Sequence, residues 1–502
     1  MLDQNQTPLL DALKNYTQHK HTPFYTPGHK RGQGISQQLA DVFGQTVFSA
    51  DLPELTELDN LFAPQSTIES AQNLAAEAFG ANHTWFLVNG STCGIEAAIL
   101  ATCGEGDKII LPRNIHSCVI SGLILSGAIP IFIHPEYDPV SDITHSITPT
   151  TLEAALQKHP DAKAVMIVYP TYYGVCGDIR AIAKLTHNYN IPLLVDEAHG
   201  AHFAFHPDLP IPALAAGADL SIQSIHKTLG ALTQASMLHI RGERINIQRI
   251  SKALQLVQST SPSYLLLASL DAARQQMSLN GKELLSHTLK LSEEAIARIS
   301  QIPNLSIPFL NCTDEGIQSL DKTRLTVNVS ANGITGFQAD EILEEKLNVY
   351  SELASMQNIT FIISIGNTKQ DIESLVQGLT ILAQDYHQHT ESLQPSLRKS
   401  TQKFFDKLKS QLKSQLESQL GYNQTISPRQ AFFASTETIA IQKSPGRISA
   451  ETICPYPPGI PFLIAGEMIA QDTLEYLQQI KSQGGFITGC ADTTLNYLKV
   501  II

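Results

Sequence analysis

The sequence predicts an α/β protein, a three-layer sandwich whose mainly parallel sheet is covered by helices on both faces. Short apolar, β-branched runs recur between about residues 66 and 270, and stretches with helical periodicity separate them. A small-residue turn joins one such run to a helix, and a carboxylate stands at the end of another. The expected strands are 85–88, 108–111, 129–133, 164–168, 192–195, 220–222 and 236–240.

The remaining patterns divide the chain into further parts. Residues 1–65 predict an N-terminal arm of loops with one short helix over 9–16, ahead of a cofactor-binding domain over 66–270. Longer helices and two short strands predict a smaller α+β domain over 271–386. A compact C-terminal α+β domain is expected over 422–502, with a rigid, non-helical loop at its prolines.

Between these domains, leucines recur every four residues on an otherwise polar stretch that repeats Ser-Gln-Leu. This pattern predicts a linker helix over 387–421, with a partner-binding helix as the alternative.

The composition of the 502 residues, 43% hydrophobic and 16% charged, is ordinary for a soluble globular protein. No apolar run reaches the roughly 18 residues of a membrane span, and the first residues lack a signal-peptide core, so we expect a cytoplasmic protein. A net charge of −13 disfavours nucleic acid as a partner and mildly favours a cationic substrate. Seven scattered cysteines without a CxxC pair predict reduced, mostly buried thiols and no metal site.

The strand over 191–195 ends at Asp196, where an open α/β sheet binds its ligands. A carboxylate there can keep a pyridine nitrogen protonated, as the ring of pyridoxal phosphate requires when it accepts electrons. Upstream, Asn89-Gly90-Ser91-Thr92 lies between a strand and a helix expected to begin at Ile95. Its backbone N–H groups and hydroxyls predict a phosphate site, although such turns are often rich in small residues for steric reasons alone.

Lys227 stands among small and hydroxyl-bearing residues in the sequence SIHKTLGALTQAS. Partial desolvation would disfavour its ammonium form and provide a nucleophilic amine for a Schiff base, whereas the alternative is a surface lysine on a turn. Asp196 and the turn at Ser91 favour the first interpretation.

Together, NGSTCG, DEAHGAH and SIHK resemble the pyridoxal-phosphate enzymes of the aspartate aminotransferase fold, known as fold type I. FYTPGHKRG (24–32), DLPELTELDNLFAP (51–64), LPRNIHS (111–117), HKTLGALTQASM (226–237) and CPYPPGIP (454–461) are more narrowly similar to the ornithine/lysine/arginine decarboxylase family. The resemblance covers almost the whole chain. It implies pyridoxal 5'-phosphate as cofactor, a homodimer or larger homo-oligomer, and decarboxylation of a basic amino acid.

The short form of the chain resembles biosynthetic arginine decarboxylases, whose product agmatine enters polyamine synthesis. Lysine or ornithine as substrate remains an alternative, and so does an aminotransferase or aldolase reaction on the same fold.

The resemblance also assigns roles to side chains. Lys227 would bind the cofactor aldehyde, Asp196 would hold the ring nitrogen's proton, and His226 or Lys227 would return a proton to Cα. His116 would stack on the ring, although Ser117 and Cys118 replace the Lys and Ser that usually follow this histidine. The further expected cofactor contacts are Ser91, Thr92, His199 and Ser224.

A basic substrate needs a carboxylate for its distal cation. Glu451, just before CPYPPG, is the first candidate, and Glu467 is the second. A surface glutamate in a turn is the alternative for each.

Overall fold

The computed structural model describes residues 2–308, 310–312, 314–392 and 425–502. These residues form two compact units, a first unit of Met1–Thr102 and Pro192–Leu285 and a second unit of Cys103–Ile191 and Ser286–Ile502. Most of the predicted linker helix over 387–421, including its Ser-Gln-Leu repeats, lies outside the described residues. The five predicted domains therefore remain a prediction.

The first unit contains four strands in the order β1-β10-β9-β8. They are β1 (His83–Leu87), β8 (Leu193–Asp196), β9 (Leu220–Gln223) and β10 (Ser236–Ile240). β8 and β9 run parallel, whereas β10 is antiparallel to both β9 and β1. All four strands were predicted, and their apolar runs form strands because nearly every side chain in them is buried.

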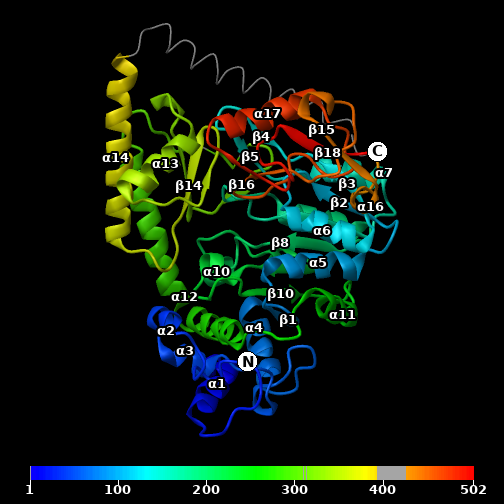
Figure 1. Cartoon of the computed structure of the whole chain (residues 1–502), viewed down its shortest axis with the longest axis vertical. Helices are drawn as coiled ribbons and strands as arrows, with labels where there is room; N and C mark the ends of the chain where they lie inside the picture. The colour runs from blue at the N-terminus through cyan, green and yellow to red at the C-terminus, as the bar shows by residue number, and fades with distance from the viewer. Residues whose placement is uncertain (1, 309, 313, 393–424) are drawn as a thin grey trace. The chain divides into compact units, whose positions relative to one another are not determined.

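Helix α5 (Gly90–Thr102) packs against β1, β9 and β10 and against α11 (Ile247–Val257). Figure 1 shows α5 beside β10 and α11. The prediction that this helix begins at Ile95 is wrong, because it begins at Gly90 and takes in the small-residue turn. Gly94 permits the close packing, since a Cβ there would lie 2.7 Å from Leu87 Cδ1 and 2.9 Å from Ile222 Cγ2.

The N-terminal segment holds more helix than the single one predicted over 9–16. It contains α1 (Pro8–Gln18), α2 (Gln37–Phe43), α3 (Gln45–Ala50) and the 3₁₀ turn η1 (Thr56–Leu58), followed by α4 (Thr67–Phe79). A buried ion pair between Arg274 and Asp271 on α12 (Tyr264–Ile299) holds the start of this N-terminal segment in place. Asp271 accepts from the backbone N–H groups of Leu9 and Leu10, and Arg274 donates to the carbonyl of Gln4.

Three parallel strands form the sheet of the second unit, in the order β6-β2-β3. They are β2 (Lys108–Pro112), β3 (Ile129–Ile133) and β6 (Ala164–Val168), all of them predicted. Their helices are α6 (Ser117–Ser126), α7 (Pro149–Lys158) and α8 (Ile179–Asn188). Two small antiparallel pairs follow, β4 (Tyr137–Asp138) with β5 (Ile143–Thr144) and β7 (Val175–Cys176) with β11 (Ser319–Leu320).

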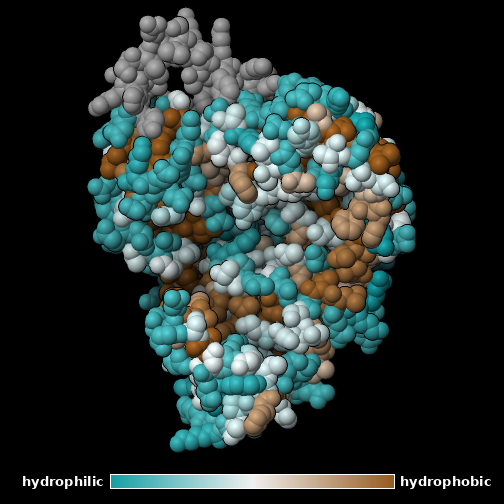
Figure 2. All heavy atoms as spheres, viewed as in Figure 1, coloured by the Kyte–Doolittle hydropathy of each residue, from teal (hydrophilic) through white to brown (hydrophobic). Residues whose placement is uncertain are grey.

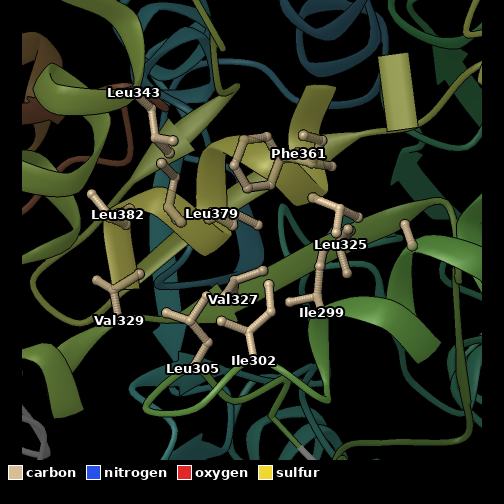
Figure 3. Close-up of a cluster of buried hydrophobic side chains, with 14 of the residues drawn as sticks. Ile299, Ile302, Leu305, Leu325, Val327, Val329, Leu343, Phe361, Leu379 and Leu382 are labelled. Carbon is tan, nitrogen blue, oxygen red and sulfur yellow. The ribbon is translucent and has the colours of Figure 1, made fainter. Parts of the chain in front are cut away.

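A second, antiparallel sheet in this unit has the order β12-β14-β13. Its strands are β12 (Arg324–Asn328), β13 (Leu353–Ala354) and β14 (Asn358–Ile362), and its helices include α13 (Gly336–Leu347) and α14 (Lys369–Ser392). Figure 3 shows its core, in which Leu325 and Val327 of β12 meet Leu379 of α14. This confirms the two short strands expected in this part of the chain.

The C-terminal part has its own hydrophobic core around Ile453, Leu477 and Val500. Its elements are α16 (Pro428–Phe433), β15 (Thr436–Ala440), β16 (Cys454–Tyr456), α17 (Gln471–Ser482), β17 (Phe486–Thr488) and β18 (Tyr497–Ile501). The proline-rich block is non-helical as predicted, but its first three residues form β16, paired with β17, rather than loop.

None of the seven cysteines is in a disulfide, and five of them are buried, which confirms the predicted buried thiols. Among the described residues, no group of three or more His, Cys, Asp or Glu side chains could hold a metal ion. No helix in the described ranges is long and apolar enough to cross a membrane.

Candidate active site

Asp196 is the last residue of β8, as the sequence predicted, and its side chain is buried at 5% exposure. Burial raises the pKa of this carboxyl, while the positive charge of Lys227 and the backbone N–H of Ala198 act to lower it. The N–H of Ala198 donates to Asp196 Oδ1 at 3.2 Å. The strand end therefore presents a desolvated carboxyl group within electrostatic reach of a lysine.

Lys227 lies on the short helix α10 (Ile225–Thr228), directly after β9 and Ser224. Its Nζ is 3.0 Å from Nε2 of His199, which follows Asp196 on the turn after β8. Lys227 is half-buried and His199 is buried, so this amine is not the fully exposed surface lysine of the alternative interpretation. The predicted trio of Asp196, His199 and Lys227 is thus gathered at the ends of two neighbouring parallel strands.

Ser91 and Ser224 come together although 133 residues separate them in the chain. Ser224 Oγ donates to Ser91 Oγ at 2.9 Å, which joins the first turn of α5 to the segment that carries Lys227. Thr92 is exposed in the same helical turn. The hydroxyls of Ser91 and Ser224 and the backbone N–H groups of a helix start are therefore located where an anion is stabilised.

The ring of His226 is held by a contact with Ala235, directly before β10. Its Nδ1 lies 3.0 Å from the carbonyl oxygen of Ala235, so this nitrogen carries the proton that is donated. Burial lowers the pKa of the ring, and the charge of Lys227 lowers it further. A neutral His226 must first gain a proton at Nε2 before it can act as an acid, so this role remains a prediction.

His116 belongs to the second unit, where it precedes α6. Its Nδ1 accepts from the N–H of Cys118 at 3.2 Å, so the ring caps the helix and has a fixed orientation. The Cβ that Gly459 lacks would lie 3.3 Å from His116 Nε2, and Ser117 N–H donates to the Gly459 carbonyl. The LPRNIHS and CPYPPGIP blocks therefore pack on each other, and stacking of His116 on a cofactor ring stays a prediction.

Both candidate substrate carboxylates, also in the second unit, have partners within it. Glu451 is buried and accepts from the backbone N–H groups of Ala491 at 2.6 Å and Lys499 at 2.9 Å. Glu467 forms an ion pair with Arg113 at 3.0 Å and accepts from the N–H of Ile464. Substrate binding by either glutamate stays a prediction, and it would have to compete with these internal contacts.

Glu197 is a residue of this site that we did not predict. It directly follows Asp196, it is fully buried, and its carboxylate accepts from three groups: Ala213 N–H, Ser221 Oγ–H and Gln223 Nε2–H. Because Ser221 and Gln223 lie on β9, Glu197 fixes the end of β8 against the strand that leads to Lys227. The sequence signal was a second acidic residue at the end of an apolar strand, where a buried charge requires partners.

We expect Glu197 to make the stability of the first unit pH-dependent. Burial raises its pKa from 4.5 to about 7, so the folded chain keeps a proton that the unfolded chain releases. That proton stabilises the fold at about pH 4.5, and the contribution, on the order of 3 kcal/mol, is lost as the pH rises to about 7. In Glu197→Gln, which cannot titrate, the unfolding free energy should fall less over this pH range.

Trp85, the single tryptophan, lies on β1 and reports unfolding of the first unit by fluorescence. Urea titrations of the cofactor-free protein at several pH values test the expectation, with the exposed Glu243→Gln as the matched control. Equal pH slopes in Glu197→Gln and the wild type would contradict it.

Comparison with known proteins adds independent evidence to this geometry. The family model described as "Orn/Lys/Arg decarboxylase, major domain" matches residues 7–317. The model described as "Orn/Lys/Arg decarboxylase, C-terminal domain" matches residues 408–490. The chain belongs to the ornithine/lysine/arginine decarboxylase family. This confirms the resemblance drawn from the motifs and the prediction of an amino-acid decarboxylase.

Two relatives of this decarboxylase show how far the similarity extends. An arginine decarboxylase of Bacillus subtilis (strain 168) is 38% identical over 507 residues, which cover 100% of this chain and 99% of the relative. The constitutive lysine decarboxylase of Escherichia coli (strain K12) is 25% identical over 570 residues, which cover 97% of this chain and 79% of the relative.

Solved structures confirm the fold of this decarboxylase. Lysine decarboxylase A from Pseudomonas aeruginosa matches with a TM-score of 0.83 at 22% identity, over 99% of this chain and 80% of its own. A serine palmitoyltransferase from Sphingomonas wittichii matches with a TM-score of 0.52 at 14% identity, over 70% of this chain and 82% of its own. The predicted fold type I architecture with a mainly parallel sheet is therefore correct.

Proposed function

We propose that the protein decarboxylates arginine to agmatine with pyridoxal 5'-phosphate as its cofactor. The observation that carries the choice of arginine is the similarity to four relatives named arginine decarboxylase, which are 38–39% identical over 93–100% of this chain. Three relatives named lysine decarboxylase are 24–25% identical.

The donor set of the first unit fits this cofactor. An aldehyde needs an amine, which Lys227 offers, and a pyridine nitrogen needs a carboxylate, which Asp196 offers. A phosphate group needs hydroxyl and N–H donors, which Ser91, Ser224 and the start of α5 offer. The amine, the carboxylate and the phosphate donors come from residues far apart in the sequence but belong to the same unit. This supports pyridoxal phosphate as the cofactor.

When bound, pyridoxal phosphate supplies an electron sink for the carbanion that loss of CO₂ leaves. The protein's own residues do the rest. Asp196 holds a proton at the ring nitrogen, and Lys227 provides the amine and afterwards a proton donor. His199 positions the Lys227 amine through the 3.0 Å contact between Nε2 and Nζ. Thr92 and His116 belong to the proposal as further cofactor contacts.

We also propose a cytoplasmic homodimer or larger homo-oligomer. Large apolar side chains are exposed in the N-terminal segment, with Phe24 at 91% and Val42 at 76%. On the second unit, Phe432 and Phe433 of α16 are exposed at 62% and 68%, and Figure 2 shows hydrophobic residues gathered over α6 and α16. Exposed apolar groups of this size support contacts with a further subunit.

A direct assay tests the proposed reaction. Purified protein incubated with pyridoxal phosphate should release CO₂ and agmatine from arginine, with a kcat/KM at least about tenfold above the values for lysine and ornithine. Light scattering of the same preparation should give a mass of two or more chains. A higher kcat/KM for lysine or ornithine would replace arginine as the substrate, and a keto acid product would indicate transamination instead.

A further inference from the structure

The turn from β1 into α5 carries Ser91, a proposed phosphate contact, and lies beyond the last ladder pair of β1. This strand stands at the end of the sheet order and pairs with β10 from His83 to Leu87. Val88, the next residue, is buried at 4% exposure. Its backbone N–H needs a partner outside the ladder, because a buried donor without an acceptor costs free energy.

Gln258 provides that partner from 170 residues further along the chain. Its Oε1 accepts from the N–H of Val88 at 2.9 Å, and its side chain is buried at 7% exposure. Gln258 also ends α11, where its own N–H donates to the carbonyl of Leu254. The side chain is therefore held at its base by the end of a helix and at its tip by the end of a strand.

A second hydrogen bond joins the same two segments in the opposite direction. The N–H of Ser259 donates to Asn89 Oδ1 at 3.2 Å. We call the two contacts, Gln258 with Val88 and Ser259 with Asn89, the turn clamp. Asn89 is directly followed by Gly90, which has a φ of 73° and is the first residue of α5. The turn clamp thus holds the two residues that precede the helix start.

The turn clamp is attached to a well-packed part of the first unit. α11 packs against α5, and Trp85 Nε1 of β1 donates to Ser251 Oγ of α11 at 3.2 Å. A bound phosphate accepts from several donors at distances of about 3 Å, so a small displacement of the turn weakens several hydrogen bonds at once. The position of the turn therefore matters more for a phosphate than for the rest of a ligand.

We propose that Gln258 is a positioning residue for the cofactor phosphate. Through the turn clamp it sets the place of Ser91 and of the first N–H groups of α5. Ser91 in turn accepts from the Ser224 hydroxyl, so both serines depend on the same turn. The inference rests on the proposed use of pyridoxal phosphate and is independent of which amino acid is decarboxylated.

The test compares pyridoxal 5'-phosphate with pyridoxal, which has the same ring and aldehyde but no phosphate. Gln258→Met keeps an unbranched side chain in the buried space and removes the oxygen that accepts from Val88. Titration of the cofactor-free protein, followed by absorbance of the bound ligand, gives both Kd values. Gln258→Met should raise the Kd of pyridoxal phosphate at least about tenfold and change that of pyridoxal less than about twofold.

The ratio of the two Kd values separates positioning from folding, since a general loss of structure weakens both ligands alike. Gln255→Met is the matched control, because Gln255 is an exposed glutamine of the same helix that contacts the carbonyl of Phe62. It should change neither Kd. Asn89→Ala removes the other half of the turn clamp, and water can replace the lost acceptor because Ser259 is exposed. This variant should shift the ratio in the same direction as Gln258→Met.

Hydrogen–deuterium exchange tests the turn clamp without any cofactor. In the cofactor-free Gln258→Met variant, the peptide that contains Val88 should exchange at least about tenfold faster than in the wild type. The peptide that contains β9 should keep its wild-type rate.

Three results would overturn the proposal: a ratio of Kd values that Gln258→Met leaves unchanged, a ratio that Asn89→Ala leaves unchanged, or wild-type exchange of the Val88 peptide in Gln258→Met. A wild-type protein that binds no pyridoxal phosphate would overturn the proposed cofactor together with this role of Gln258. A failure of the arginine assay with the cofactor bound would concern the proposed substrate alone.

Discussion

Lys227→Ala should abolish decarboxylation and remove the site of covalent cofactor attachment. The amine at Lys227 is half-buried, lies 3.0 Å from His199 and is close enough to Asp196 to lower that carboxyl's pKa. Its loss removes both the nucleophile for the aldehyde and a proton donor. We expect kcat to fall by at least about 10⁴-fold, the upper end of what one acid–base group contributes.

Mass spectrometry gives the decisive measurement. After borohydride reduction of the wild-type holoenzyme, pyridoxyl should be found on the peptide that contains Lys227, and in Lys227→Ala on no peptide. Lys252→Ala, an exposed lysine of α11 in the same unit, is the control and should retain both the label and the activity. Pyridoxyl located on another lysine of the wild type would refute the assignment of Lys227.

The sheet was predictable because its strands are buried on both faces. Apolar runs such as Ala164–Val168 carry no competing signal, and this strand formed over the residues expected. Helix starts were less predictable. Gly90, Ser91 and Thr92 are poor helix formers, yet they begin α5, because tertiary packing through Gly94 compensates for weak propensity.

The N-terminal segment was underestimated for a similar reason. Its helices α2 and α3 are only seven and six residues long, too short to show a clear helical period. The cost of ordering this segment is offset by contacts far along the chain, such as those of Arg274 and Asp271 with residues 4 to 10. No local pattern records such contacts.

Residues of the candidate site could be predicted where a residue of that type, at that position in the sequence, has a single chemical use. A lone lysine and a strand-end aspartate fit this description, and the structure brings Asp196, His199 and Lys227 together. Glu197 was not predicted, because its role depends on partners such as Ser221 that only the fold supplies. Glu451 was chosen for its sequence neighbours, and the sequence could not reveal that two backbone N–H groups occupy its carboxylate.

Asp196→Asn should leave the cofactor bound but lower kcat by roughly 100-fold or more. Asparagine can still accept from Ala198 N–H through Oδ1, so the turn after β8 keeps its hydrogen bond. A neutral amide cannot hold the ring nitrogen's proton while negative charge develops at Cα, and this loss affects turnover rather than binding. Absorbance of the bound cofactor and steady-state kinetics measure the two effects separately.

Stability distinguishes this role of Asp196 from a structural one. Burial raises the pKa of the Asp196 carboxyl, so its charge costs free energy in the folded, cofactor-free protein. Removing that charge should leave the unfolding midpoint of the cofactor-free Asp196→Asn variant equal to, or above, that of the wild type. The exposed Asp208→Asn, in the same unit, serves as control and should change neither kcat nor the midpoint. Near-normal turnover in Asp196→Asn, or a midpoint that falls together with kcat, would contradict the proposal that Asp196 acts on the ring nitrogen.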